Sequence, residues 1–355
     1  MTMIQEGIAK LVELQHLSSQ EASQIMGEIM RGEATNSQVA SFLTALRMKG
    51  ETVEEIVAFA ETMRRFSQRI SPKVRGRIVD TCGTGGDKIK TFNVSTAAAL
   101  IAASAGVTIA KHGNRSVTSK CGSADVLEHF GVNLNLEPQK VERLIEDIGI
   151  GFMFAPIFHP AMKNAIAPRK EIGIRTVFNI LGPLTNPASA DAQLLGVYDE
   201  RMVEPLAHAL TGLGVEDAMV IHGRGGLDEI STVGETILAR ISGKTVELKC
   251  LTCSDFGVPK AGIEDLLELD VDGSISVTYQ ILSGRRLGQD TKRDMALVNA
   301  AAAIFLGGLA TDLKEGVELA KRSVESGATY RKLVALVKGS GGSLAKLETL
   351  EERYG

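Results

Sequence analysis

The chain has 355 residues, of which 44% are hydrophobic and 23% are charged, and this composition excludes a disordered or collagen-like protein. Its 39 Lys and Arg residues against 43 Asp and Glu residues leave a formal net charge of -4, so the chain as a whole does not attract nucleic acid or an anionic membrane. The N-terminus lacks the basic and then apolar start of a signal peptide, and the longest apolar runs fall short of a membrane span. We therefore expect a soluble, cytoplasmic protein.

The first 70 residues predict a small all-helical domain. Three residue pairs match the capping box that begins helices: Ser18 with Glu21, Thr35 with Gln38, and Thr52 with Glu55. Apolar residues recur at the spacing of a helix face, and no strand pattern interrupts them. Helices this short need partners to bury such a face, so we expect them to pack together. We place this domain at residues 1–70 and, after a linker that contains Pro and Gly, a second domain at residues 74–355.

The second domain predicts alternating strands and helices. Its first elements are a strand, a helix, a strand and a helix, at residues 77–81, 95–105, 107–110 and from Ser123. That order is typical of a parallel sheet, and later strands are expected at residues 148–154, 193–198, 218–221, 236–241 and 244–251. Residues 160–181 have a helical pattern that Pro168 interrupts. The predicted fold class is α/β, with a mostly parallel central sheet beside a small all-helical N-terminal domain.

A glycine-rich loop follows the first predicted strand. It contains Gly83, Gly85, Gly86 and Asp87, and the next helix begins among Thr91, Asn93, Ser95 and Thr96. Glycines let the backbone approach a ligand closely, and the N-terminus of a helix favours an anion. We interpret the loop as a phosphate-binding site, although it matches neither the Walker A pattern nor G-x-G-x-x-G. A tight turn followed by ordinary capping residues is the alternative that this loop alone leaves open.

A basic loop follows the next predicted strand. Residues 111–120 bring Lys111, Arg115 and Lys120 together with several hydroxyl groups. The carboxyl ends of neighbouring parallel strands meet at one edge of the sheet, so this loop should lie beside the glycine loop. Cations next to a glycine loop favour an anionic ligand over the alternative of a solvated basic loop.

An acidic pair lies on a third loop, after the strand at residues 218–221. Asp228 and Glu229 follow Gly223, Gly225 and Gly226. Adjacent carboxylates suit a hard cation such as Mg²⁺ that also contacts phosphate oxygens. For an Asp-Glu pair considered alone, an exposed turn is the more common explanation.

Taken together, these loops resemble the anthranilate phosphoribosyltransferase family. The resemblance extends over essentially the whole chain, and its most specific parts are Pro168-Arg169, Asp228-Glu229 and the blocks at residues 83–87, 93–96, 111–115, 121–128, 173–176 and 179–187. The resemblance implies transfer of a 5-phosphoribosyl group from 5-phosphoribosyl-1-diphosphate (PRPP) to the amino group of anthranilate, with Mg²⁺ as cofactor, in tryptophan biosynthesis. It also implies a nucleoside phosphorylase/phosphoribosyltransferase-like fold and a homodimer that forms through the helical domain. Residues 160–185 would pack back onto that domain.

The resemblance assigns roles to individual positions. The positions that match PRPP-binding residues are Gly83, Gly86, Asp87, Thr91, Asn93, Val94, Ser95, Thr96, Lys111, Ser119 and Ser123. The positions that match anthranilate-binding residues are Gly83, Asn114 and Arg169, with His112 and His159 expected beside them. Ser95, Asp228 and Glu229 match Mg²⁺ ligands, and the residues expected to act in catalysis are Lys111, Asp228 and Glu229.

Two alternatives remain at this stage. A pyrimidine-nucleoside phosphorylase shares the architecture and a similar basic loop, but the sequences at residues 93–96, Pro168-Arg169 and Asp228-Glu229 favour the transferase. A non-enzymatic relative of the same fold that binds nucleic acid would conflict with the charge of -4 and with the intact substrate positions. We therefore expect small-molecule substrates, and no nucleic acid or membrane partner.

Overall fold

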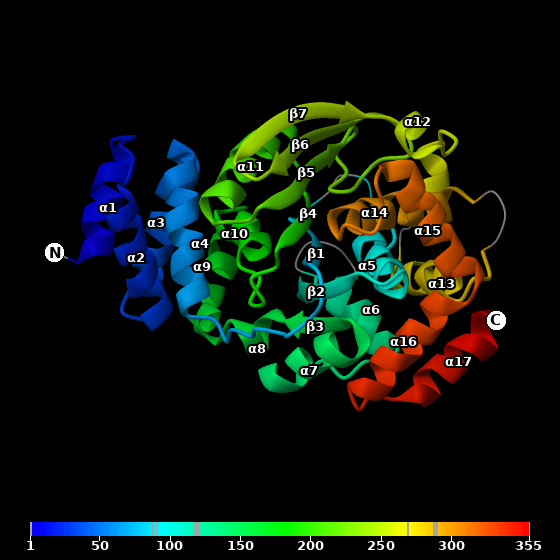
Figure 1. The fold of residues 1–355 in the computed structure, drawn as a ribbon. Coiled ribbons are helices and arrows are strands. Elements are labelled where there is room, and N and C mark those ends of the chain that lie inside the picture. The colour runs from blue at the N-terminus through cyan, green and yellow to red at the C-terminus, as the bar shows by residue number, and fades with distance from the viewer. Residues whose placement is uncertain are drawn as a thin grey trace.

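The computed structural model describes residues 2–86, 89, 91–116, 121–267, 270–286 and 290–354. Two predicted site residues, Asp87 and Ser119, lie outside the described residues. The chain begins with a helical bundle at one end of the molecule (Figure 1), formed by α1 (Met3–Val12), α2 (Ser19–Arg31), α3 (Asn36–Lys49) and α4 (Val53–Arg65). The three predicted capping boxes are confirmed at the starts of α2, α3 and α4.

The remaining elements surround a seven-stranded sheet with the order β3-β2-β1-β4-β5-β6-β7. Its strands are β1 (Ile78–Gly83), β2 (Thr108–Gly113), β3 (Ile150–Phe154), β4 (Ala192–Gly196), β5 (Asp217–Gly223), β6 (Thr236–Ser242) and β7 (Thr245–Leu251). The first five strands are parallel, and β6 and β7 are antiparallel. The mostly parallel sheet is therefore confirmed, with strand ends that differ from the predicted ones by a few residues.

Alternating side chains of the sheet pack into two hydrophobic cores. Leu194 and Met219 belong to a core that includes α5 (Val94–Ser104), whereas Leu195 and Val220 belong to a core that includes α1–α4. The helices of the first core are α5, α6 (Ser123–His129), α7 (Pro138–Ile148), α13 (Val271–Leu282), α14 (Thr291–Leu306), α15 (Leu313–Glu325), α16 (Ala328–Gly339) and α17 (Leu344–Tyr354). Those that join the bundle in the second core are α9 (Lys163–Ile172), α10 (Phe178–Leu184) and α11 (Val203–Gly212). Short helices lie at α8 (Ala155–Phe158), α12 (Cys253–Phe256), Pro160–Met162, Glu200–Met202 and Glu264–Leu266.

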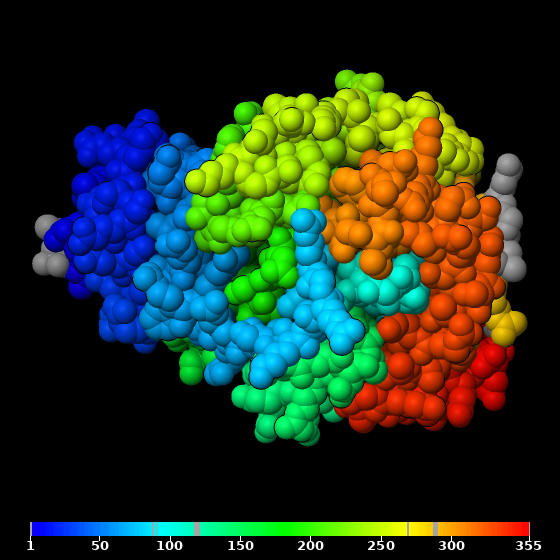
Figure 2. Space-filling view, viewed as in Figure 1, coloured from blue at the N-terminus to red at the C-terminus, as the bar shows by residue number. Residues whose placement is uncertain are grey.

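The bundle is joined to the sheet in two ways. The connection from α4 to β1 runs over the surface, as Figure 2 shows in light blue. The segment around α9 returns to the bundle, where Asn164 Nδ2 donates to the carbonyl of Met30 at 2.9 Å and Ala165 is fully buried in the same core. Among the described residues, no helix is both long and apolar enough to span a membrane.

The predicted helix break at Pro168 is wrong. Helix α9 continues through Pro168 and ends at Gly173, which adopts a left-handed conformation with φ of 63°. Pro168 removes one backbone donor, and its ring is buried within the helix span. Glycine takes the left-handed conformation without steric strain, and the helix therefore ends there.

Candidate active site

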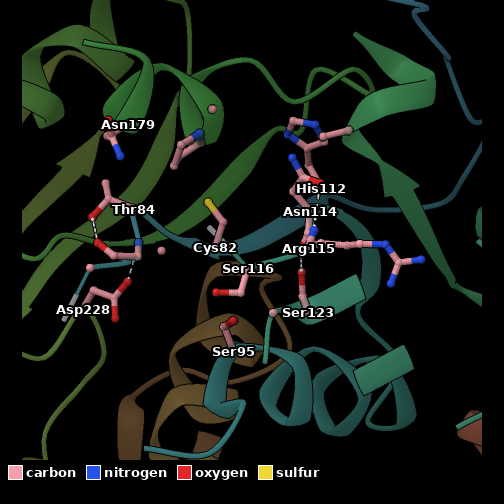
Figure 3. Close-up of a pocket in the computed structure, with 18 of the residues that line it drawn as sticks. Cys82, Thr84, Ser95, His112, Asn114, Arg115, Ser116, Ser123, Asn179 and Asp228 are labelled. Carbon is pink, nitrogen blue, oxygen red and sulfur yellow. Dashed lines mark hydrogen bonds between the residues drawn. The ribbon is translucent and has the colours of Figure 1, made fainter. Parts of the chain in front are cut away.

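A cleft of about 650 Å³ lies at the carboxyl ends of β1 and β2 and extends to α9 and α10. In the sheet, β1 lies between β2 and β4. The chain adds β2 and β3 on one side of β1 and then β4 and β5 on the other, so the strand order reverses at β1. Ligands of open α/β sheets commonly bind at such a reversal. Figure 3 shows the walls of the cleft: Thr84 and Asp228 on one side, His112, Asn114 and Arg115 on the other, and Ser95 and Ser123 below.

Most of the predicted site residues meet in this cleft. Its lining includes Gly83, Gly86, Thr91, Asn93, Val94, Ser95, Lys111, His112, Asn114, Ser123, His159, Arg169, Asp228 and Glu229. Thr96 does not line the cleft, and its side chain is buried in the first turn of α5. Most of them lie at the carboxyl ends of β1, β2 and β5 or at the helix starts that follow, as predicted, whereas His159 follows α8 and Arg169 lies on α9.

The glycine loop and the acidic loop pack tightly against each other. The backbone N–H of Gly85 donates to Asp228 Oδ2 at 2.8 Å. A Cβ atom at Gly83 would lie 2.3 Å from Asp228 Oδ2, and one at Gly196 would lie 1.6 Å from the backbone oxygen of Asp228. Only glycine at these two positions allows this approach, so the sequence of β1 and β4 determines where the carboxylate of Asp228 lies.

The N-terminus of α5 faces the cleft without a side-chain cap. Asn93 is the N-cap residue, but its side chain makes no capping hydrogen bond. Its Nδ2 instead donates to the carbonyl of Cys121 at 3.3 Å and to Ser274 Oγ at 3.0 Å. The N–H of Val94 donates to the carbonyl of Phe92 at 2.8 Å, and the N–H of Ala97 makes the first bond within the helix. The N–H groups of Ser95 and Thr96 between them therefore suit an anion, where the helix dipole also favours negative charge.

Lys111 is buried at the base of the cleft, with 3% of its surface exposed. Its ammonium donates to the carbonyl of Thr81 at 2.6 Å and to Ser95 Oγ at 3.3 Å. Burial lowers the pKa of Lys111, and the nearby Asp80 opposes that change. An amine in this position adds positive charge beside the α5 N-terminus.

The basic loop supplies fewer unpaired cations than its sequence suggests. Arg115 lines the cleft, but its guanidinium donates to Asp125 Oδ1 at 2.9 Å and to Glu128 Oε2 at 2.8 Å. The two carboxylates lie on α6, which follows the loop directly, and they neutralise the arginine. Lys120 lies outside the described residues.

The other end of the cleft combines neutral rings with the guanidinium of Arg169. The rings of His112 and His159 have centroids 5.0 Å apart. Burial lowers the pKa of His112 to about 3 and that of His159 to about 4, so both rings are neutral at neutral pH. Arg169 lies half-buried with its guanidinium carbon 5.1 Å from the centroid of the Phe178 ring. A cation in an apolar, ring-lined region can fix a small aromatic carboxylate.

Sequence reasoning assigned no role to several lining residues, among them Thr84, Arg175, Asn179, Asp270 and Ser274. Arg175 and Asn179 lie in the blocks at residues 173–176 and 179–187 that resemble the family, and this resemblance is the signal that could have placed them at the site. Asp270 and Ser274 come from the start of α13, far along the chain, where no motif marks them.

The oxygen donors of the cleft fit Mg²⁺. Asp228, Glu229 and Ser95 offer two carboxylates and a hydroxyl, which are the hard ligands that Mg²⁺ prefers. Within the described part of the chain, no group of three or more His, Cys, Asp or Glu side chains could enclose a metal. Mg²⁺ is usually held by one or two carboxylates together with water and substrate phosphates, so this set fits an ion that binds with a phosphorylated ligand.

Comparison with known proteins identifies the same family over most of the chain. Residues 75–330 match the glycosyl transferase family, a/b domain, and residues 5–67 match the helical bundle domain of the same family. The anthranilate phosphoribosyltransferase of Persephonella marina is 46% identical over 340 residues, which are 96% of this chain and 100% of the relative.

Solved structures agree in fold. The crystal structure of anthranilate phosphoribosyltransferase from Thermus thermophilus has a TM-score of 0.88 at 38% identity and covers 94% of this chain and 99% of its own. The same enzyme from Saccharomyces cerevisiae, in complex with PRPP and Mg, has a TM-score of 0.88 at 30% identity, with 95% and 98% covered.

Proposed function

The chain belongs to the anthranilate phosphoribosyltransferase family, and we propose that its cleft joins PRPP and anthranilate in the arrangement described below. The protein is a glycosyltransferase of tryptophan biosynthesis that transfers the 5-phosphoribosyl group of PRPP to the amino group of anthranilate, with diphosphate as the second product. The observation that carries the assignment of substrates to subsites is the contrast between the two ends of one cleft. One end gathers phosphate-binding features, and the other places a single arginine among neutral rings.

PRPP occupies the end formed by the glycine loop, the α5 N-terminus and Lys111. Free N–H groups and a buried amine suit its phosphate oxygens, and the side chains of Thr91, Asn93, Ser95 and Ser123 supply further polar contacts. Asp87, Thr96 and Ser119 are also proposed to bind PRPP. For Thr96 this rests on its backbone N–H, because its side chain is buried away from the cleft.

Anthranilate occupies the other end, next to Gly83. The fork of donors on Arg169 fits its carboxylate, and Asn114 offers hydrogen bonds to the carboxylate or the amine. His112 and His159 provide neutral aromatic walls. An aniline nitrogen is already uncharged at neutral pH, so the reaction needs orientation of the amine toward the anomeric carbon more than it needs a strong base.

The residues of this chain stabilise the charge that develops as the diphosphate leaves. Lys111 and the backbone N–H groups of Ser95 and Thr96 at the start of α5 act on that negative charge in a partly water-excluded site. Asp228, Glu229 and Ser95 would hold Mg²⁺. When bound, this ion supplies a positive charge that stabilises the departing diphosphate.

One assay tests the proposed function. We expect the fluorescence of anthranilate to disappear when the protein is supplied with PRPP and Mg²⁺, with diphosphate released in equal amount. Turnover of thymidine with inorganic phosphate, and none of anthranilate, would contradict this proposal and support the phosphorylase.

We also propose that the protein is a homodimer joined through the helical bundle, and that it acts on small molecules without a nucleic acid or membrane partner. The support for the dimer is apolar surface on the bundle, where Val12, Leu14 and Met48 are 61%, 67% and 79% exposed. The cytoplasmic location expected from the sequence stays a prediction.

A further inference from the structure

Arg175 reaches from the connection between α9 and α10 to the glycine loop. Its Nη2 donates to the backbone oxygen of Gly86 at 2.6 Å. Its guanidinium carbon lies 4.2 Å from the centroid of the Tyr198 ring, in the loop after β4. Both contacts are to uncharged groups, and Arg175 itself lines the cleft. The side chain thus joins two loops that border the phosphate-binding end.

Arg175 approaches Gly86 so closely that no side chain fits there. A Cβ atom at Gly86 would lie 2.5 Å from Arg175 Nη2, and the residue has φ of 83°, a conformation that side chains disfavour. Gly85, with φ of 66°, has the same handedness. Two consecutive left-handed residues have no regular hydrogen-bond ladder of their own, so the loop depends on outside contacts to hold one conformation.

Those outside contacts come from three directions. Thr84 donates its backbone N–H to the carbonyl of Gly196 at 2.9 Å, and its hydroxyl accepts from the N–H of Tyr198 at 3.2 Å. Asp228 holds the N–H of Gly85, on the wall that Figure 3 shows beside Thr84. Within the described part of the chain, Arg175 is the residue that donates to the carbonyl of Gly86.

We propose that Arg175 is a positioning residue that fixes the glycine loop in the conformation that binds PRPP. This inference rests on the proposed function and adds a residue to which neither the sequence nor the comparison gave a role. The planar guanidinium is required because one face packs on Tyr198 while one edge donates to Gly86. Lysine keeps the charge but has neither the flat face nor the fixed fork.

Arg175 follows Arg169 by six residues, yet the two arginines serve different substrates. Arg169 faces the apolar end of the cleft beside Phe178, and Arg175 contacts the phosphate loop. Loss of each arginine should therefore change the Michaelis constant of a different substrate. A general loss of folding would change both constants or the amount of active enzyme instead.

The test compares Arg175→Ala, Arg175→Lys and Arg175→Gln with wild type in steady-state kinetics. We expect Arg175→Ala to raise the KM for PRPP roughly tenfold, as expected when a charge-assisted hydrogen bond and its stacking partner are lost. The KM for anthranilate should stay within about twofold, since no contact with that subsite changes. Arg175→Lys should still show more than half of the increase in log KM seen in Arg175→Ala, because lysine cannot stack on the Tyr198 ring.

Matched variants separate positioning from charge or folding. Arg201→Ala removes a nearby arginine whose side chain is 86% exposed and paired with Asp199, so it should leave both constants unchanged. Tyr198→Leu, which removes the ring, should raise the KM for PRPP, whereas Tyr198→Phe should not. Melting temperatures of all variants show whether any of them has lost its fold.

Binding of PRPP with Mg²⁺, measured by calorimetry without anthranilate, distinguishes failure of this inference from failure of the proposed function. If wild type binds PRPP about tenfold more tightly than Arg175→Ala, the inference holds even when no turnover of anthranilate is seen. Equal PRPP affinity or equal KM in wild type and Arg175→Ala would overturn it. Absence of PRPP binding to wild type would overturn both.

Discussion

Asp228 has two tasks at the scale of a single residue, because its Oδ2 holds the N–H of Gly85 and its carboxylate is proposed to bind Mg²⁺. Substitution by asparagine keeps an oxygen acceptor for Gly85 but removes the charge. We predict that Asp228→Asn combined with Glu229→Gln lowers turnover at ordinary Mg²⁺ by at least roughly 100-fold, because hard anionic ligands are lost. Anthranilate fluorescence gives the rate, and an unchanged melting temperature controls for folding. Near-normal activity would remove the metal role.

Arg169 allows a second prediction at this scale. Burial lowers the pKa of its guanidinium, which nevertheless stays charged, and a charged group in a partly water-excluded site binds a carboxylate strongly. Arg169→Ala should raise the KM for anthranilate by roughly 30- to 150-fold, equivalent to about 2–3 kcal/mol, and leave PRPP binding nearly unchanged. Lys111→Ala should show the reverse pattern. If Arg169→Ala weakens PRPP as much as anthranilate, the division into two subsites is wrong.

The buried histidines predict an acid sensitivity of the fold. The pKa of His112 is about 3 and that of His159 about 4, both below the usual 6.5, so the unfolded chain binds protons more readily than the folded one. Above pH 6.5, keeping these rings neutral does not lower the free energy of unfolding. Below pH 6.5 it lowers the free energy of unfolding increasingly, by about 2 kcal/mol for each ring at pH 5. We predict that His112→Gln lowers the change in unfolding free energy between pH 7 and pH 5. An equal pH dependence in urea denaturation of both proteins would contradict this.

At the scale of elements, the sequence predicted the sheet and the bundle well because their signals are local. Capping boxes at Ser18, Thr35 and Thr52 marked true helix starts, and the strand–loop–helix order placed β1 and β2 with their loops at one edge. Contacts between distant elements left weaker signals. The pairing of Arg115 with α6 and the approach of Ser274 to Asn93 depend on tertiary packing, which a single sequence does not show.

The contact between β4 and the loop after β5 gives a prediction about elements. A Cβ atom at Gly196 would lie 1.6 Å from the backbone oxygen of Asp228, so Gly196→Ala must push the acidic loop away from the glycine loop. We predict a loss of activity of at least about tenfold, since a displacement of about 1 Å is costly at a reacting centre. Gly234 lies on the connection between β5 and β6, which also carries Asp228. Gly234→Ala is a matched control, because a Cβ atom there would lie at an ordinary 3.7 Å from the nearest atom, Cβ of Arg224. Equal activity of both variants would contradict the role of this contact.

At the scale of the whole molecule, the helical bundle carries apolar surface where the α1–α2 connection approaches the end of α3. His16 Nδ1 lies 3.1 Å from Lys49 Nζ, which forms a buried ion pair with Glu55 at 2.6 Å. These contacts bring the segment after α1 to the end of α3. Leu14 lies two residues before His16, and Met48 lies directly before Lys49, so both lie at the same end of the bundle. Val12 is the last residue of α1 and precedes Leu14 by two residues.

Exposed apolar side chains of this size at one end of the bundle support the proposed dimer face. Stable dimers bury on the order of 1,000 Å² or more in total, so the proposed interface would include more of α1 and α3 than these three residues. We predict a dimer by light scattering at micromolar concentration, and a monomer for Val12→Glu combined with Met48→Glu, because two buried charges on each partner disfavour association. Among the described residues of the bundle helices, only Met63 on α4 lines the cleft, so the monomeric variant should keep PRPP binding. Leu248→Glu, an equally exposed position on β7, should leave the dimer intact. A wild-type protein that is monomeric, or a double variant that remains dimeric, would exclude this face as the interface.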